Sequence, residues 1–163
     1  MCLGLDRYYI DTDETNKEQE RVLRELMRIA KSADIPVILH SRKAEKRVLE
    51  LLLEENVKKA VFHCFGGKMK LAKEIAQAGY FLSIPCGSIA DTPSNQFRKM
   101  VELVPIESLL SETDSPYLGP VKGQRNDPRN VRRGIAIMAV VKRIDERKMR
   151  DMIRANFKTL FGL

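Results

Sequence analysis

Short apolar runs alternate with amphipathic stretches along this chain, and that alternation limits the fold more than any other feature. Five runs have the length and composition of buried strands, at residues 2–5, 36–40, 60–65, 80–84 and 108–111. A segment with helical spacing of its apolar residues follows each of the first four. Strand and helix in repeated succession predict an α/β fold with a parallel sheet, because parallel neighbours need a crossover connection.

The helices are expected at residues 14–33, 42–55, 68–78, 93–104, 129–143 and 146–159. Spacings of three and four residues assign an apolar face to the first two. That face comprises Val22, Leu26, Ile29 and Ala33 in the first helix, and Val48, Leu51 and Leu52 in the second.

Size and composition fit a single domain over residues 1–163, with 44% hydrophobic and 31% charged residues. No apolar run approaches the roughly 20 residues of a membrane span, and no signal peptide is recognised. We therefore expect a cytoplasmic protein with no membrane partner. Cys2, Cys64 and Cys86 are too scattered for a disulfide framework or a CxxC zinc site, so reduced thiols are expected.

The chain is basic, which favours a polyanionic partner such as nucleic acid. Lys and Arg number 29 against 22 Asp and Glu, for a net charge of +7. The basic residues are spread over several helices. Solvated helix faces therefore remain an equally good interpretation.

Three of the apolar runs end near a residue that can bind a divalent metal ion. PVILH ends at His40, AVFHC contains His63 and SLLSETD ends at Asp114, and these two histidines are the only ones in the chain. The carboxyl ends of parallel strands share one edge, where active sites collect. Imidazole and carboxylate together suit zinc, manganese or a two-metal site. The sequence therefore predicts a metal centre at that edge.

Each of these residues also has a purely structural interpretation. A single histidine after an apolar run is more often a core or edge residue than a ligand. Asp114 is followed by Ser115 and Pro116, so it can equally cap a turn. Two histidines at equivalent strand ends favour the metal site.

Longer motifs resemble the TatD-type metal-dependent deoxyribonucleases, a branch of the amidohydrolase-like TIM barrels. The matching strings are GLD, LHSRKA, FHCFGG, ETDSPYLGP, KGQRNDP and the terminal NFKTLFGL. They occur in the family's order and near its spacing, over the whole chain. The resemblance implies parallel β/α units of a TIM barrel and a metal-dependent hydrolase acting on phosphodiester bonds, of the 3'-5' exonuclease type.

The resemblance also implies roles for individual residues. His40, His63 and Asp114 would bind up to two divalent ions (Mg, Mn or Zn), and Asp114 would orient or deprotonate the attacking water. Glu112 would fix a histidine or a loop as a supporting partner. Arg42 and Arg125 would hold substrate phosphate, because a guanidinium forms a bidentate fork with it. A surface ion pair is the alternative for both arginines, and for Arg42 it is an equally good interpretation.

The sequence departs from the family pattern near its start. It contains no HxH pair, and Cys2 stands where the family has the glutamate that bridges two metals. One ion is therefore the simpler expectation here. A complete barrel has eight strands in about 250 residues, so we expect a barrel of about five strands that lacks the first β/α units. Its open edges favour a homo-oligomer that covers them.

Two functions of different class follow. The first is the nuclease, with DNA or another nucleic acid as substrate. The second is a catalytically impaired remnant that serves as a nucleic-acid-binding or structural module. Related barrels also cleave amides and lactones, and the charge of Arg42, Lys122 and Arg125 favours phosphodiesters over these.

Overall fold

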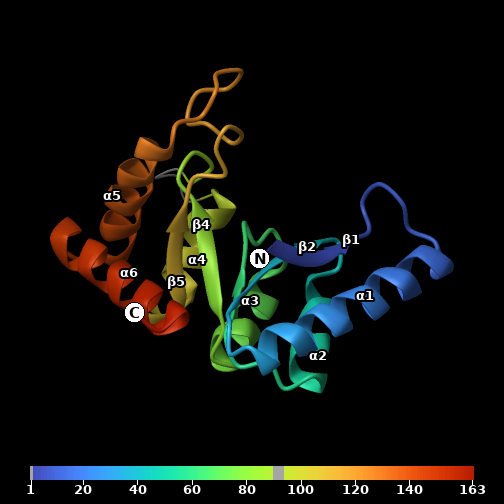
Figure 1. Cartoon of the computed structure of the whole chain (residues 1–163). Helices are drawn as coiled ribbons and strands as arrows, with labels where there is room; N and C mark the ends of the chain where they lie inside the picture. The colour runs from blue at the N-terminus through green and yellow to red at the C-terminus, as the bar shows by residue number, and fades with distance from the viewer. Residues whose placement is uncertain (1, 90–93) are drawn as a thin grey trace.

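The chain folds into an open sheet of five parallel strands with helices packed along it (Figure 1). The structure is a computed structural model that describes residues 2–89 and 94–163, with only the backbone of Cys2. The strands lie side by side in chain order. They are β1 (Cys2–Asp6), β2 (Val37–Arg42), β3 (Ala60–Phe62), β4 (Phe81–Pro85) and β5 (Leu109–Glu112). The expected α/β fold with five parallel strands is confirmed.

The helices match the expected segments with shifted ends. They are α1 (Asp13–Ser32), α2 (Glu45–Glu54), α3 (Met69–Gln77), α4 (Gln96–Leu103), α5 (Val131–Lys142) and α6 (Glu146–Phe161), with short 3-10 turns at Ile106–Ser108 and Pro128–Asn130. The expectation that α2 begins at residue 42 was wrong. Strand β2 continues to Arg42, and Lys43 then takes a left-handed φ of 57° that no helix continues through. The expected start of α4 at Pro93 falls outside the described residues.

Strand β3 is shorter than the expected run of residues 60–65. It ends at Phe62, and Cys64 two residues later has a φ of 45°. Left-handed backbone cannot extend a strand, so His63 stands at a turn immediately beyond the sheet.

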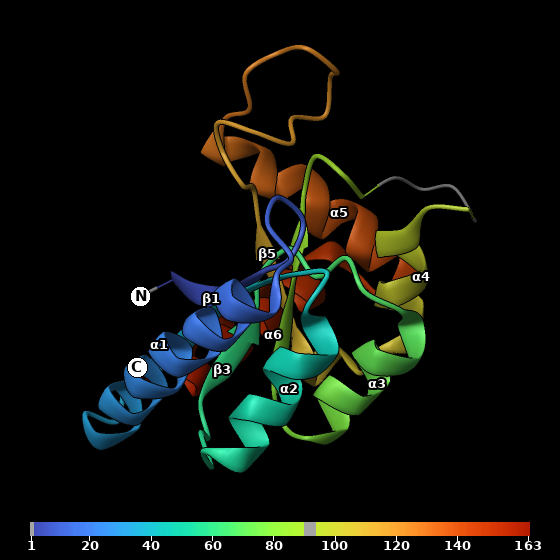
Figure 2. The same ribbon diagram turned by 90° about the vertical axis from the view of Figure 1, so that its right-hand side faces the viewer.

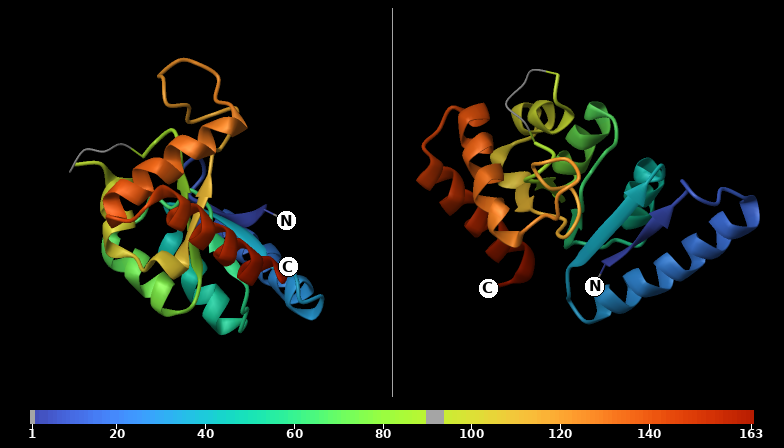
Figure 3. Two further views of the ribbon diagram at one scale, coloured as in Figure 1. Left: turned by 90° about the vertical axis from the view of Figure 1, so that its left-hand side faces the viewer. Right: turned by 90° about the horizontal axis from the view of Figure 1, so that it is seen from above.

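One face of the sheet holds the main core. Helices α1 to α4 lie along this side, as Figures 2 and 3 show, and alternate strand residues such as Leu39, Phe62 and Leu82 are fully buried beneath them. In α2, Val48, Leu51 and Leu52 are buried as expected. Helices α5 and α6 pack together beyond β5, at the opposite end of the sheet from α1.

The apolar face expected for α1 was displaced by one residue. Leu23, Met27 and Ala30 are buried, whereas Val22 is 39% and Ile29 56% exposed. Leu26 is partly buried, and Ala33 lies at the surface. Both stripes have helical spacing and apolar residues, so only the packing of α1 against β1 distinguishes them.

The other face of the sheet is less covered. Ile38, Phe81 and Val61 point to it and form a small second cluster with Leu110 and with Leu160 and Phe161 of α6. The side chains that follow them on the same face, toward the carboxyl ends of the strands, are polar. No helix among the described residues is long and apolar enough to cross a membrane.

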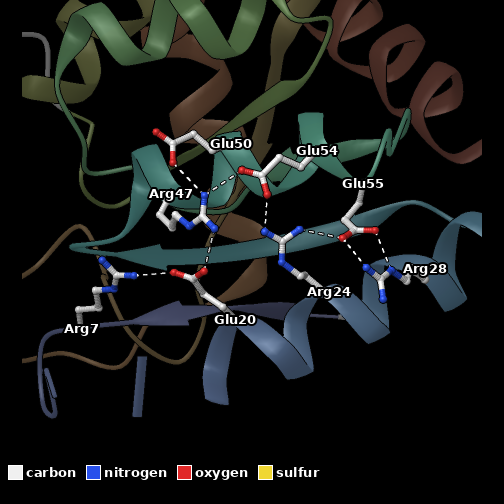
Figure 4. Close-up of polar contacts among 8 residues, drawn as sticks. All are labelled: Arg7, Glu20, Arg24, Arg28, Arg47, Glu50, Glu54 and Glu55. Atoms are coloured by element: carbon white, nitrogen blue, oxygen red, sulfur yellow. Dashed lines mark hydrogen bonds and ion pairs between the residues drawn. The ribbon is translucent and has the colours of Figure 1, made fainter. Parts of the chain in front are cut away.

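An ionic network joins α1 to α2 on the outer surface (Figure 4). Arg47 of α2 lies 2.9 Å from Glu20 of α1, and Glu20 also pairs with Arg7. At the other end, Glu55 pairs with Arg24 and Arg28, each at 2.8 Å. Arg24 and Arg47 share Glu54, which connects the two halves.

Candidate metal centre

The period of two along each strand brings polar residues to one corner of the sheet. His40 stands two residues beyond Ile38, His63 two beyond Val61, Ser83 two beyond Phe81 and Glu112 two beyond Leu110. Residues two apart in a strand face the same side, so these groups continue the less covered face at its carboxyl end. His40, His63 and Glu112 therefore gather at one edge of the sheet, as parallel topology requires.

His63 has an acidic partner at each ring nitrogen. Its Nδ1 bonds to Glu112 Oε2, and its Nε2 lies 3.2 Å from Asp114 Oδ1. Ser83 Oγ donates to the same Glu112 oxygen at 2.7 Å. The hydrogen bond with Glu112, helped by the charge of Asp114 and opposed by burial, raises the pKa of His63. A proton on Nδ1 that is donated to Glu112 leaves the Nε2 lone pair directed toward Asp114.

His40 has a different acidic partner, Asp6 at the end of β1. His40 Nε2 lies 2.9 Å from Asp6 Oδ2, and the other Asp6 oxygen accepts the Tyr8 backbone N–H at 2.8 Å. Although partial burial opposes it, these hydrogen bonds lower the pKa of Asp6. Gly4 permits the close approach of β1, because a Cβ there would lie 1.9 Å from the His40 carbonyl oxygen. Strand β1 thus carries the Asp6 carboxylate to the histidine.

His40, His63 and Asp114 line one cavity of about 530 Å³. His63 pairs with Asp114 within it, whereas His40 pairs with Asp6, which does not line the cavity. Among residues 2–89 and 94–163, no group of three or more His, Cys, Asp or Glu side chains is close enough to hold an ion together. The three predicted ligands thus face the same space without converging on one point.

Three of the residues that follow the strands at this edge of the sheet have left-handed backbone. Lys43, Cys64 and Asp114 follow β2, β3 and β5, and all three have left-handed φ values, of 57°, 45° and 57°. Such conformations are uncommon outside glycine and are enriched at functional sites. Burial, together with the charges of Glu112 and Asp114, raises the pKa of Cys64 to about 12. At neutral pH, without a bound metal, its thiol is therefore protonated.

The two arginines predicted to hold phosphate lie apart. Arg42 lines the cavity with His40 and His63. Its guanidinium carbon lies 3.5 Å from the centre of the Tyr8 ring. Arg125 instead lines a separate depression in the loop after β5, with Ser115 and Pro116. Of these two arginines, only Arg42 therefore lines the same cavity as the histidines.

Asn126 organises the loop that carries Asp114. It is buried, and its side-chain Nδ2 donates to the carbonyl oxygens of Thr113 at 2.6 Å and Tyr117 at 2.7 Å. Its Oδ1 accepts the Asp127 backbone N–H at 2.9 Å. This loop projects past the carboxyl ends of the strands, in orange in Figure 1. The asparagine ties the Asp114 turn to the segment before α5.

Sequence reasoning did not assign roles to Asp6, Ser83 or Asn126. Asp6 carries the same signal as Asp114, an acidic residue at the end of an apolar run, and could have been found by it. Ser83 and Asn126 have no such signal. Their contacts, with Glu112 and with the Thr113 carbonyl, join segments far apart in the sequence.

The geometry of both pairs fits a divalent ion. Neighbouring ligands that are each about 2.1 Å from one ion lie about 3 Å apart. The His40–Asp6 and His63–Asp114 separations of 2.9 and 3.2 Å match that spacing. Within the described part of the chain, the buried Glu112 Oε1 has no hydrogen-bond partner. Each pair therefore has the donor types and the spacing of two metal ligands, although the same separations are those of the hydrogen bond and ion pair that the residues form with each other.

Comparison with known proteins identifies the lineage of this arrangement. The family described as "TatD related DNase" matches residues 2–162. The chain is 37% identical over 161 residues to the protein named deoxyribonuclease TATDN3 of Homo sapiens, covering 98% of this chain and 58% of that protein. It is 35% identical over 164 residues to the Escherichia coli protein named "Uncharacterized metal-dependent hydrolase YcfH", covering 98% and 61%.

Solved structures agree with this lineage. The fold superimposes on the crystal structure of YJJV, a TatD homolog from Escherichia coli, with a TM-score of 0.88 and 29% identity, over 99% of this chain and 62% of that one. The chain spans between 54% and 61% of the length of the curated relatives it matches, which include the TATDN3 proteins and YcfH. A family match over nearly the whole chain and the same arrangement of strands and helices show that this chain belongs to the TatD-related deoxyribonuclease family.

Proposed function

We propose that this chain carries the metal-binding part of a metal-dependent hydrolase that acts on phosphodiester bonds, a TatD-like deoxyribonuclease of the 3'-5' exonuclease type. The observation that supports this most is the setting of His63. One ring nitrogen bonds to Glu112, and the other faces the Asp114 carboxylate across a separation suited to a shared ion. Buried histidine–carboxylate pairs of this kind orient metal ligands.

The proposed roles follow from these contacts. His40, His63 and Asp114 bind the divalent ion or ions, and Asp114 also accepts a proton from the attacking water. Glu112 fixes the ring and tautomer of His63. When bound, a divalent ion supplies Lewis-acid stabilisation of charge on phosphate oxygens. Arg42, at the same cavity, binds a phosphate, and Arg125 binds the strand farther out along the loop.

Nucleic acid is the substrate class that this proposal favours. The human relative carries the name deoxyribonuclease, and the chain has a net charge of +7. Positive charge raises the local concentration of a polyanion and favours its association. Among metal hydrolases of this barrel type, an arginine beside the ligands suits a phosphodiester better than a neutral amide or lactone.

A second candidate function is a non-catalytic module that binds nucleic acid or plays a structural part. It is favoured by the two separate ligand pairs, because no three ligands converge among the described residues.

Cleavage of a labelled DNA strand with and without divalent metal distinguishes the two candidates. The nuclease proposal predicts shortening of the strand in Mg²⁺ or Mn²⁺ that stops in EDTA, with single nucleotides released from the 3' end. The module predicts retention of DNA without any shortening, at every metal tested.

Asp114→Asn is the variant that attributes cleavage to this site. The proposal predicts a loss of at least about a hundredfold, because a carboxylate that binds metal and accepts a proton becomes a neutral amide. Asp34→Asn is a matched control, since Asp34 also has a left-handed φ, of 54°, and is an exposed partner of Lys59. Equal activity of the two variants would contradict the assignment.

A further inference from the structure

Two exposed tyrosines beside the cavity have no part in the proposed chemistry. Tyr8 and Tyr9 lie two and three residues after the end of β1, and they are 49% and 77% exposed. Their ring centres are 4.9 Å apart and their planes nearly perpendicular, at 88°. Tyrosine rings in contact with each other and left in solvent form a patch suited to a ligand rather than to a core.

Basic groups are held against this pair. The Arg42 guanidinium carbon lies 3.5 Å from the Tyr8 ring centre and 5.3 Å from that of Tyr9. Arg42 Nη1 donates to the Tyr9 hydroxyl at 3.4 Å, and Lys43 Nζ lies 5.0 Å from the Tyr8 ring. Cation–π contacts of this kind fix the position of an otherwise mobile arginine. The patch therefore combines open aromatic surface with two positive charges.

The geometry gives the two tyrosines different tasks. Arg42 covers one face of Tyr8, so that ring serves chiefly to hold the guanidinium. Perpendicular rings cannot both lie flat on the same planar ligand. Tyr9, the more exposed ring, is left to present its face to solvent. A flat ligand can stack on Tyr9 while its anionic part reaches Arg42 and Lys43.

The patch is linked directly to the candidate metal centre. The Asp6 carboxylate that contacts His40 also accepts the Tyr8 backbone N–H. Arg42 lies two residues beyond His40 on β2 and lines the same cavity. A phosphate bound by Arg42 would thus lie next to the histidines, with the attached nucleotide beside Tyr9.

We propose that Tyr8, Tyr9 and Arg42 form a stacking subsite, in which Tyr9 receives one unpaired base and Arg42, held by Tyr8, binds the adjacent phosphate. Stacking on an aromatic side chain is the usual way in which single-stranded nucleic acid is held without regard to sequence. A base inside a duplex has both faces covered and must first leave the stack. The inference rests on the proposed function and adds to it the residues that position the strand.

Binding by wild type and two Tyr9 variants tests this, in EDTA so that cleavage does not interfere. The ligands are fluorescein-labelled oligothymidylate and a strand of the same length in which every nucleotide lacks its base, and anisotropy gives the Kd of each. Wild type should bind the first at least about fivefold more tightly, the lower end of what one stacked base contributes. Tyr9→Leu should lose most of that preference, whereas Tyr9→Phe, which keeps the ring, should retain it.

The outcomes separate this inference from the proposed function. If Tyr9→Leu keeps the wild-type preference, or if wild type does not distinguish the strands or binds neither, the stacking subsite is contradicted, whatever the cleavage assay shows. If the preference is lost in Tyr9→Leu while no metal-dependent cleavage occurs, the subsite stands and the nuclease proposal fails. Because the Tyr9 side chain is largely exposed, circular dichroism should show the same fold for all three proteins.

Discussion

Glu112 shows how one side chain can determine the state of the candidate centre. It contacts His63 Nδ1 and accepts a hydrogen bond from Ser83, so it fixes both the ring and its tautomer. Its position could be predicted from the sequence, because it lies two residues before Asp114 at the end of an apolar run, although β5 itself ends at Glu112. The contact with Ser83 could not, since it joins β4 to β5 through side chains that carry no pattern.

Glu112→Gln should weaken the binding of Mn²⁺ or Zn²⁺ by about 10- to 100-fold, the usual effect of losing a carboxylate behind a histidine ligand. Isothermal titration calorimetry would measure it. Glu107→Gln, in the turn before β5, is a control that should bind as wild type does. Unchanged affinity in Glu112→Gln would show that His63 needs no such partner.

Asn126 has a similar role for the loop after β5. Its replacement by Ala would leave the Thr113 and Tyr117 carbonyl oxygens without their donor, at a cost of about 1–3 kcal/mol in the free energy of unfolding. Urea denaturation should show this loss, and hydrogen exchange should rise in residues 113–127. If exchange there stayed as slow as in wild type, Asn126 would not be what holds the loop.

Among the secondary-structure elements, α1 and α2 are joined by charges as well as by the core. The network of Figure 4 connects Glu20, Glu54 and Glu55 to arginines of both helices. Hydrogen bonds from Arg28 and Arg24, against a small opposing effect of burial, lower the pKa of Glu55 from 4.5 to about 2. A lowered folded-state pKa means that this contribution to stability is complete above pH 4.5 and is lost as pH falls toward 2.

Urea denaturation across this pH range tests the network. Glu55→Gln should lower the unfolding free energy at pH 7 by about 1 kcal/mol, and the difference from wild type should shrink as pH falls toward 2 and as salt rises. Glu18→Gln is the control, because Glu18 pairs only within α1 and is well exposed. A difference for Glu55→Gln that is independent of pH would contradict an ionic origin.

The helices also show which features of the fold cannot be predicted from sequence patterns alone. The succession of elements could be predicted from periodicity, since short apolar runs alternate with segments of helical spacing, whereas the order of the strands came from the structure. The buried stripe of α1 could not be predicted in this way, because two adjacent stripes of the helix are both apolar. The contact with β1 selects Leu23 and Met27 over Val22 and Ile29. Arg125 was grouped with Arg42 by chemistry, and the loop geometry separated them.

The outermost strands of the sheet are β1 and β5, of which β5 also packs against α5 and α6, and the less covered face lies between them. A depression of about 470 Å³ on that face is lined by Val61, Leu110, Phe157 and Phe161 and also by His63 and Glu112 of the candidate centre, and Phe157 is 45% exposed. Unpaired strand edges and apolar surface favour association. We therefore predict that copies of the chain associate through this face.

Sedimentation velocity should show a mass above that of the 18.7 kDa monomer at micromolar concentration. Phe157→Lys should shift the equilibrium toward monomer, because a charge would have to be buried in the interface. Lys158→Glu, a neighbouring substitution on the same helix, would show whether any change in charge has the same effect. A monomer at all concentrations would contradict the prediction.

The central claim is that the carboxyl ends of β2, β3 and β5 form a metal centre. Its most direct test is the metal content of the purified chain after incubation with Mn²⁺ or Zn²⁺ and removal of free ion, compared with that of His63→Ala. We predict at least one ion per chain in wild type and a loss of bound ion in the variant. Wild type without bound metal, or a variant that retains as much as wild type, would contradict the claim.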